Sequence, residues 1–264
     1  MMNRPLSGKR ALITGSTRGL GLATARRLAA DGCDVVIHGL DEGAALEAIR
    51  AGIERDHGVR SISSGADLRE AAAIASLITA AMDSLGGIDI LVNNAVARHT
   101  APVEEFTPDD WNTALAVNLS SAFHTTRLLV PGMKQRGWGR IINVSSIYGL
   151  RGATNRVGYV TTKTALIGLT RAVALETAKD GITCNAVCPG TSASPVHEEV
   201  IAQMMTSEGL SPVAAEMRLL AGKQPTGRLI SADGLAALIA FLCSDAAADI
   251  TGAVLPIDAG WSAS

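Results

Sequence analysis

The fold is decided by the stretch Thr14-Gly15-Ser16-Thr17-Arg18-Gly19-Leu20-Gly21, which joins an apolar run at residues 11–14 to a helical pattern at residues 20–30. Its three glycines allow a tight turn and let the backbone approach a bound group closely. The helix that follows directs its first N–H groups at this turn, which suits a pyrophosphate. The stretch therefore predicts a dinucleotide site between the first strand and the first helix; a plain structural turn is the alternative.

The rest of the chain repeats this alternation of short apolar strands and longer helical patterns. Strands are expected at residues 11–14, 35–37, 59–63, 88–92, 140–144, 183–187 and 253–257, and helices at 20–30, 44–55, 71–85, 111–134, 158–178 and 235–242. Because the strands are almost entirely apolar, they should be buried on both faces. We therefore expect an α/β fold with a doubly wound parallel sheet of the Rossmann type.

Residues 191–230 interrupt the alternation. They contain Pro195, Pro212 and Pro225 and two short helical patterns, and they would hang over the carboxyl edge of the sheet. We interpret them as a small helical lid over a substrate site; a helical packing annex is the alternative. Because no linker or short repeat is visible, residues 1–264 are expected to form a single domain.

The composition argues against several classes of protein. In 264 residues, 23 Lys and Arg stand against 25 Asp and Glu, so nucleic-acid binding is not expected. A membrane span needs about 18 uninterrupted apolar residues, and neither such a stretch nor an apolar secretory core is present. We therefore expect a cytoplasmic protein that does not contact membranes. Of the histidines only His197 lies near Cys184 and Cys188, so we expect buried structural cysteines and no metal site.

The spacing Thr-Gly-(three residues)-Gly-x-Gly resembles the short-chain dehydrogenase/reductase family, and further motifs follow in that family's order. These are Asn93-Asn94-Ala95, Asn118, Ser146, Tyr159-x-x-x-Lys163 and Pro189-Gly190. Within the family the chain most resembles D-3-hydroxybutyrate dehydrogenases, through His99-Thr100 and residues 137–143, 174–178, 223–225 and 244–261. The resemblance implies an NAD(P)-dependent oxidoreductase that interconverts a secondary alcohol and a carbonyl, usually as a homo-oligomer, either a tetramer or a dimer.

Tyr159 and Lys163 lie four residues apart in an expected helix, so their side chains share one face. A free phenol has a pKa of about 10, and a nearby ammonium group lowers it. The resemblance implies that Tyr159 is the general acid and base and that Lys163 lowers its pKa and holds the cofactor ribose. It also implies that Ser146 hydrogen-bonds the reacting oxygen and that Asn118 holds a backbone kink or a water in a proton path. Each residue taken alone has an alternative role: Tyr159 could only pack, Lys163 could be solvated, and Ser146 could belong to a turn.

The resemblance also implies a set of cofactor contacts along the chain. They are Gly15, Thr17, Arg18, Gly19, Leu20 and Gly21 at the phosphates, Asp67 and Leu68 at the adenine, Asn93 and Ala95 in the nucleotide groove, Tyr159 and Lys163 at the ribose, and Pro189, Gly190, Ser192 and Ser194 at the nicotinamide. Enzymes that prefer NAD usually carry an acid at the end of the second strand, whereas here Gly39 takes that place and Asp41 follows two residues later. Arg18 resembles the base that binds the 2′-phosphate of NADP. We therefore favour NADP, with NAD as the alternative.

The chain differs from hydroxybutyrate enzymes at five positions where those enzymes hold their small carboxylate. Arg98 replaces a glutamine, Tyr148 a histidine, Arg156 a lysine, Thr191 a tryptophan and Val200 a glutamine. The smaller Thr191 widens the pocket, and arginines at residues 98, 151 and 156 near its mouth favour an anion. We expect a hydroxy acid or acidic sugar, larger than hydroxybutyrate, to contact Arg98, Ser146, Tyr148, Arg156 and Thr191. Arginines that only face solvent are the alternative.

Two other functions are compatible with the sequence. The glycine-rich stretch also fits a 3-oxoacyl thioester reductase of fatty-acid type. From another class, a nucleotide-binding regulator without catalytic activity is possible on the same fold, and the intact Ser146, Tyr159 and Lys163 argue against it.

Overall fold

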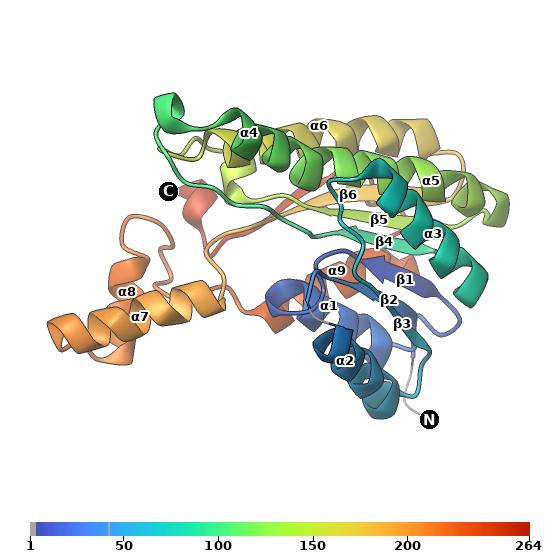
Figure 1. The fold of residues 1–264 in the computed structure, drawn as a ribbon, viewed down its shortest axis with the longest axis horizontal. Coiled ribbons are helices and arrows are strands. Elements are labelled where there is room, and N and C mark those ends of the chain that lie inside the picture. Colours follow the sequence, from blue (N-terminus) through green and yellow to red (C-terminus); the bar gives the residue numbers. More distant parts are fainter. Residues whose placement is uncertain (1–3, 42) are drawn as a thin grey trace.

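The centre of the molecule is a seven-stranded sheet in which every strand is parallel to its neighbours (Figure 1). It is seen in a computed structural model that describes residues 4–41 and 43–264, without the side chains of residues 195 and 196. The strands are β1 (Arg10–Ile13), β2 (Asp34–His38), β3 (Ser61–Ser64), β4 (Ile90–Asn93), β5 (Gly139–Val144), β6 (Ile182–Pro189) and β7 (Val254–Ile257). Their order, β3-β2-β1-β4-β5-β6-β7, shows that the chain winds outward twice from the boundary between β1 and β4. The predicted doubly wound parallel sheet is confirmed.

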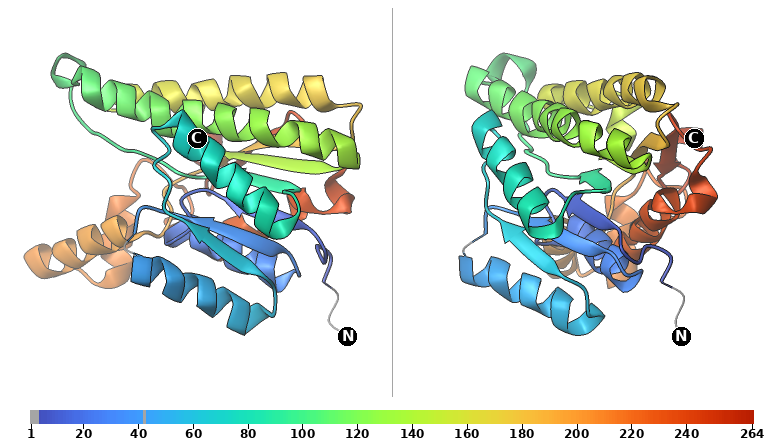
Figure 2. Two further views of the ribbon diagram at one scale, coloured as in Figure 1. Left: turned by 45° about the vertical axis from the view of Figure 1, so that its right-hand side comes forward. Right: turned by 90° about the vertical axis from the view of Figure 1, so that its right-hand side faces the viewer.

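Helices cover both faces of the sheet (Figure 2). One face is covered by α1 (Gly19–Ala30), α2 (Gly43–His57) and α9 (Ala232–Cys243), and the other by α3 (Ala71–Leu85), α4 (Pro108–Leu115), α5 (Ser121–Arg136) and α6 (Val157–Thr177). Successive strand residues point to opposite faces, so Ile13 packs in the first cluster and Leu12 in the second. Because both faces are covered, every residue of β4, β5 and β6 is buried, which explains the unbroken apolar runs in the sequence.

The helix expected at residues 111–134 is longer than predicted and not regular throughout. It begins at Pro108, where Thr107 accepts a hydrogen bond from the Asp110 amide, and it continues to Arg136. Between α4 and α5 the chain makes a π-helical segment (Ala116–Ser120) that contains Asn118. A π-helical turn contains one residue more than an α-helical turn and is often found at functional sites. This π-helical segment lies close to the carboxyl edge of the sheet.

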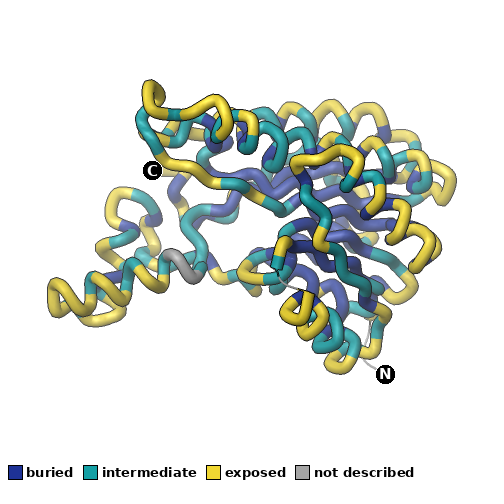
Figure 3. The backbone as a smooth tube through the Cα atoms, in the orientation of Figure 1, coloured by how far each residue is buried: buried dark blue, intermediate teal, exposed yellow. Residues whose placement is uncertain are grey.

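Residues 191–230 form two helices, α7 (Pro195–Glu208) and α8 (Pro212–Leu219), after the carboxyl end of β6. Ser194 and Ser211 cap these helices by accepting hydrogen bonds from the amides of His197 and Ala214. The two helices pack on each other and project from the body of the molecule (Figure 1). Most of this pair is coloured as exposed in Figure 3. Its exposed apolar side chains include Val213 and Met217.

Among the described helices, none is long and apolar enough to cross a membrane. All four cysteines, Cys33, Cys184, Cys188 and Cys243, are buried and unpaired, and burial raises the pKa of each thiol.

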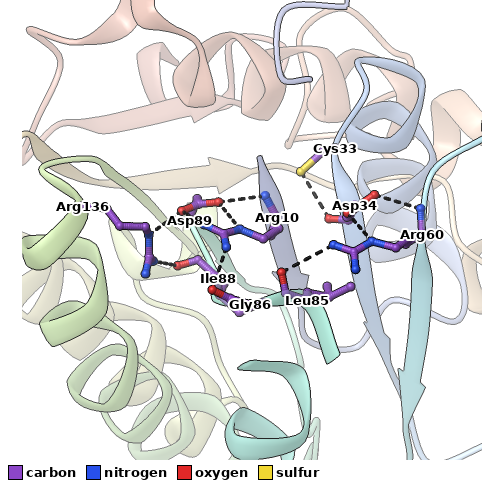
Figure 4. A network of polar contacts seen from close by, with 9 residues as sticks. All are labelled: Arg10, Cys33, Asp34, Arg60, Leu85, Gly86, Ile88, Asp89 and Arg136. Atoms are coloured by element: carbon purple, nitrogen blue, oxygen red, sulfur yellow. Dashed lines mark hydrogen bonds and ion pairs between the residues drawn. The ribbon is translucent and has the colours of Figure 1, made fainter. Parts of the chain in front are cut away.

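An ion-pair network connects the amino ends of β1 and β4, at the edge of the sheet opposite the carboxyl ends of the strands (Figure 4). The buried carboxylate of Asp89, just before β4, receives the Arg10 guanidinium from β1 at 2.7 Å and the Arg136 guanidinium from α5 at 2.8 Å. Arg10 also donates to the Gly86 carbonyl and Arg136 to the Ile88 carbonyl. The network therefore connects β1, β4 and α5 through one buried charge.

Replacing Asp89 by Asn should lower the free energy of unfolding by roughly 3 kcal/mol, because two arginines lose their anion at a buried site. Asp56→Asn is the matched control, since the Arg55–Asp56 pair is exposed on both sides and should contribute less than about 1 kcal/mol. Urea denaturation at neutral pH measures both values. Equal effects of the two substitutions would contradict a structural role for the network.

Candidate active site

A cleft of about 620 Å³ opens at the carboxyl edge of the sheet. Its lining comes from the glycine-rich turn after β1, the ends of β2, β5 and β6, the segments after β3 and β4, and α6. In a doubly wound sheet, ligands bind where the strand order reverses, which here is the boundary of β1 and β4. The cleft therefore lies where this fold binds ligands.

The glycine-rich turn packs against the segment after β4 without space for side chains. Gly15 has a φ of +64°, and a Cβ on it would lie 2.9 Å from Ala95 Cα. A Cβ on Gly21 would lie 2.1 Å from the Gly15 carbonyl oxygen. The side chain of Thr14 completes this contact by accepting hydrogen bonds from the amides of Asn94 and Ala95, each at 3.0 Å. Glycine is therefore required at both positions by close packing.

The amino end of α1 has no side-chain cap in the part of the chain that the structure describes, and its first turn contains no acidic residue. By contrast, Thr107, Ser211 and Ser231 cap α4, α8 and α9. Apart from its own chain neighbours and helix backbone, no atom of the described residues lies within 4 Å of the position that a Cβ of Gly19 would take. Helix N–H groups without acceptors, next to open space in a cleft, fit a diphosphate group.

A negatively and a positively charged side chain line the cleft near the end of β2. Gly39, Leu40 and Asp41 line the cleft there, as does Arg18 from the glycine-rich turn. A Cβ on Gly39 would lie 2.5 Å from Thr17 Cγ2 and 2.9 Å from Asp41 Oδ2. The Asp41 carboxylate therefore lies near Thr17, and this end of the cleft is lined by both a carboxylate and a guanidinium.

Tyr159 and Lys163 lie on the same face of α6 and both line the cleft. Lys163 is buried, its Nζ donates a hydrogen bond to the Val144 carbonyl at 2.7 Å, and it lies 5.8 Å from the centre of the Tyr159 ring. Burial, and secondly the positive charge of Arg98, lower the pKa of Lys163 to about 7. The amine is therefore held next to the tyrosine in a site where its charged form is costly.

Two serines follow β5, and the short turn after them (Ile147–Gly149) fixes both. Ser146 Oγ lines the cleft and accepts a hydrogen bond from the Tyr148 amide at 3.1 Å. Ser145 Oγ donates to the Lys163 carbonyl at 2.7 Å, which joins the strand end to α6. A Cβ on Gly149 would lie 2.4 Å from Ser145 Oγ, so the turn needs glycine there.

Asn118 connects three segments behind the cleft and does not line it. Its Oδ1 accepts from the Ala97 amide at 2.7 Å, and its Nδ2 donates to the Ala97 carbonyl at 3.0 Å and to Thr162 Oγ1 at 3.3 Å. Because Thr162 precedes Lys163 on α6, Asn118 ties the π-helical segment and the segment after β4 to the helix that carries the tyrosine and lysine.

The structure brings the predicted cofactor residues together with one exception. The cleft is lined by Gly15, Thr17, Arg18, Gly19, Leu20, Gly21, Asp67, Leu68, Ala95, Tyr159, Lys163, Pro189, Gly190, Ser192 and Ser194. The side chain of Asn93 instead lies in the core, where its Nδ2 donates to Asn143 Oδ1 and its Oδ1 accepts from Thr125 Oγ1, both at 2.8 Å. Its neighbour Asn94 faces the cleft and donates to the Gly15 carbonyl.

Of the predicted substrate residues, Arg98 and Ser146 line the cleft, whereas Tyr148, Arg156 and Thr191 do not. Arg156 lies at the amino end of α6, and the Thr191 carbonyl accepts a hydrogen bond from the Ile230 amide. The Tyr148 ring packs edge-on against Tyr159, at 6.4 Å between ring centres, and against Trp261, at 5.4 Å. Tyr148 therefore packs against Tyr159 without lining the cleft.

Several residues at the site were not among the sequence predictions, notably His38, Asn94, Ser145 and Trp261. Asn94 could have been found from its place beside Asn93, and His38 from its position as a polar residue at the end of an apolar strand. Trp261 has no local signal, since it meets Tyr148 only through the fold. Arg151, predicted near the pocket mouth, donates to the Trp261 carbonyl at 2.6 Å. Among the described residues, no group of three or more His, Cys, Asp or Glu side chains could hold a metal ion.

Residues 9–205 match the family described as short chain dehydrogenase. The chain belongs to the short-chain dehydrogenase family. This short-chain dehydrogenase is 43% identical to a D-beta-hydroxybutyrate dehydrogenase of Cupriavidus necator over 98% of this chain and 99% of the relative. It is 34% identical to a 2-keto-3-deoxy-L-fuconate dehydrogenase of Xanthomonas campestris, over 98% of this chain and 82% of the relative.

A solved structure agrees with this membership. L-sorbose reductase from Gluconobacter frateurii, in complex with NADPH and L-sorbose, superposes with a TM-score of 0.92 at 29% identity, over 98% of each chain. The present short-chain dehydrogenase is thus an NAD(P)-dependent oxidoreductase that interconverts an alcohol and a carbonyl. The glycine-rich turn and the uncapped amino end of α1 fit the diphosphate of that cofactor.

The buried Lys163 should make stability depend on pH. Its folded-state pKa, about 7, lies below its unfolded value of about 10.4, so the unfolded chain binds more protons between these values. The cost of burying the charge is therefore present in full below pH 7 and disappears as the pH rises toward 10. Lys163→Met should be more stable relative to the wild type at pH 6 than at pH 9.5.

Urea denaturation without nucleotide at pH 6, 8 and 9.5 checks this trend. Lys134→Met, at a lysine with a side chain that is 42% exposed, serves as the control. If both substitutions show the same trend with pH, burial of Lys163 is not its cause.

Proposed function

We propose that this enzyme interconverts the hydroxyl and carbonyl forms of a hydroxy acid or acidic sugar larger than 3-hydroxybutyrate. The observation that carries the proposal is Arg98, which lines the cleft and has its guanidinium carbon 5.7 Å from the centre of the Tyr159 ring. A guanidinium group binds a carboxylate through two parallel hydrogen bonds. Arg98 therefore offers a place for the acid group of a substrate next to the side chain proposed to exchange the proton.

The relatives support the acidic substrate in part. Two of them are named for acids, hydroxybutyrate and 2-keto-3-deoxy-L-fuconate, whereas the structural neighbour carries the neutral sugar L-sorbose. Arg151 and Arg156 lie outside the cleft lining, so the proposal rests on Arg98 rather than on all the predicted arginines. Neutral polyols are consequently the necessary comparison in any assay.

For the chemistry, we propose Tyr159 as general acid and base. The bound cofactor supplies the hydride acceptor or donor. During oxidation, Tyr159 Oη takes the proton from the substrate hydroxyl, and during reduction it returns it. Lys163 lies in the same cleft behind the tyrosine, and its charged form stabilises the phenolate that this transfer creates.

We propose two supporting roles beside Tyr159. Ser146 Oγ, held by the Tyr148 amide, hydrogen-bonds the reacting oxygen and stabilises the charge that develops on it. Asn118 maintains the relative position of α6 and the segment after β4 through its contacts with Thr162 and Ala97. Helices α7 and α8 are proposed as the lid, since they follow the carboxyl end of β6 and expose apolar side chains that closure would cover.

We propose NADP as the preferred cofactor because Arg18 lines the cleft near the end of β2, where a guanidinium suits the 2′-phosphate. Arg18→Ala should raise KM for NADP roughly tenfold through the loss of a charge-assisted hydrogen bond. KM for NAD should change less than about threefold. Arg26→Ala, at an arginine of α1 outside this cleft, is the control. Should Arg18→Ala leave the ratio of the two KM values unchanged, the preference does not depend on Arg18.

The substrate proposal is tested by nicotinamide absorbance across hydroxy acids, acidic sugars, neutral polyols and an acetoacetyl thioester. Turnover of an acid should disappear in Tyr159→Phe, which lacks the proton-exchanging oxygen. Arg98→Gln should raise KM for the acid about tenfold or more and change KM for a neutral substrate less than about threefold. Arg156→Gln is the matched control, because Arg156 does not line the cleft.

Two outcomes would contradict the proposal. Equal effects of Arg98→Gln on acidic and neutral substrates would show that Arg98 does not bind an anion. Turnover of the thioester alone would instead identify the enzyme as a 3-oxoacyl thioester reductase.

A further inference from the structure

His38, the last residue of β2, is a buried histidine with both ring nitrogens engaged at the edge of the cleft. Its Nδ1 accepts a hydrogen bond from the Gly15 amide at 3.1 Å. Its Nε2 lies 2.7 Å from the Ala66 carbonyl oxygen, to which it can only donate. Since an amide on one side and a carbonyl on the other fix the tautomer, the ring is neutral and carries its proton on Nε2.

The backbone around His38 strengthens the same connection. The His38 amide donates to Ser16 Oγ at 2.9 Å, the Ser16 amide donates to the His38 carbonyl at 2.7 Å, and Ser16 Oγ donates to the Ile13 carbonyl at 2.7 Å. The glycine-rich turn is therefore attached to β2 through both main chain and side chain. The ring is the group that extends this attachment to the segment after β3.

The two segments joined by the imidazole both line the nucleotide cleft. On one side stands the glycine-rich turn, and on the other Ala66 precedes Asp67 and Leu68. These segments come from separate strands, β1 and β3, with β2 between them. The distance between the phosphate end and the adenine end of the proposed cofactor site therefore depends on this side chain.

We propose that His38 is a positioning residue of the dinucleotide site and that its protonation weakens nucleotide binding. A second proton on the ring turns Nδ1 into a donor that faces the Gly15 N–H, another donor. The contact is then lost, and the Gly15 amide has no acceptor on the ring, while the hydrogen bonds between Ser16 and the main chain of His38 remain. The proposal rests on the proposed nucleotide contacts of these segments and is independent of the substrate.

The charged surroundings of His38 favour the neutral ring. Burial is the largest influence and lowers the pKa of His38, while the Ala66 carbonyl and the Asp67 carboxylate act in the opposite direction. Asp67 is itself paired with Arg69 at 2.6 Å, and the other charged groups of this part of the cleft are Arg18 and Asp41. Since the folded pKa lies below the ordinary value of about 6.5, the neutral-ring contact is complete above that pH and is lost as the pH falls below it.

The test is the dissociation constant of NAD⁺, measured by titration calorimetry on the full chain between pH 5 and 8. NAD⁺ is the probe because, unlike NADP, it carries no phosphate monoester that titrates at about pH 6. The wild type should lose affinity as the pH falls from 7.5 to 5, because the protonated ring no longer accepts the Gly15 N–H. His38→Asn retains a hydrogen-bonding amide that does not titrate, so its affinity should be close to that of the wild type at pH 7.5 and nearly constant with pH.

Two further variants complete the experiment. His38→Leu has no acceptor for the Gly15 amide, so it should bind NAD⁺ about tenfold more weakly than the wild type at pH 7.5 and show an affinity that is nearly constant with pH. His124→Asn, on α5 and away from the cleft lining, should keep the pH dependence of the wild type. Thermal unfolding at each pH shows that the variants are folded, so that a general loss of structure is separated from a change in the site.

The outcomes distinguish the proposals from one another. An equal loss of affinity with falling pH in His38→Asn and the wild type would overturn the role of the ring, as would wild-type affinity in His38→Leu. Failure of the wild type to bind either NAD⁺ or NADP at pH 7.5 would overturn both the nucleotide contacts and the role of His38. Nucleotide binding with the expected pH dependence, but no turnover of any acid, would overturn only the proposed substrate.

Discussion

The structure depends on the burial of a parallel sheet on both of its faces. Seven strands with the same direction need helical crossovers, and each crossover places a helix on one face or the other. The two windings run outward from the boundary of β1 and β4, so the crossovers diverge there and leave a crevice at the carboxyl edge. The cleft with Tyr159 and Lys163 is therefore a consequence of how the sheet is covered.

The two edges of the sheet have different physical tasks. At the amino edge, Asp89 joins β1, β4 and α5 by pairing with two arginines, and this edge lies away from the cleft. Three features of the carboxyl edge lower stability: the glycine-rich turn, the uncapped end of α1 and the burial of Lys163, which lowers its pKa. A bound anion or a reacting group can offset these costs. Stability and chemistry thus occupy opposite ends of the same strands.

Buried polar side chains hold the loops of the carboxyl edge at defined distances. His38 joins the segments after β1 and β3, Asn118 joins the segment after β4 to α6, and Asn93 joins β4 to β5 and α5. Each uses nearly all of its hydrogen-bonding groups within the protein. Because unsatisfied polar groups are costly in a buried environment, such residues specify one arrangement of the loops.

The sequence by itself determined the features that depend on neighbours along the chain. The apolar strands, the glycine-rich turn and the four-residue spacing of Tyr159 and Lys163 are local patterns, and the structure shows the sheet, the cleft and the shared helix face that they predict. The local patterns did not predict the π-helical turn around Asn118, where the side chain of that residue contacts Ala97 and Thr162 from distant parts of the chain.

Only the tertiary structure decided which polar side chains face the cleft. Neighbouring strand-end residues such as Asn93 and Asn94 point to opposite environments, and their chemistry does not reveal which one is buried. Arg98 and Arg156 are equally basic in the sequence, yet only Arg98 lines the cleft. Tyr148 reaches Trp261 across more than a hundred residues, and His38 joins β1 to β3. The physical reason is that local propensity follows the covalent chain, whereas contacts in the site depend on how distant segments pack.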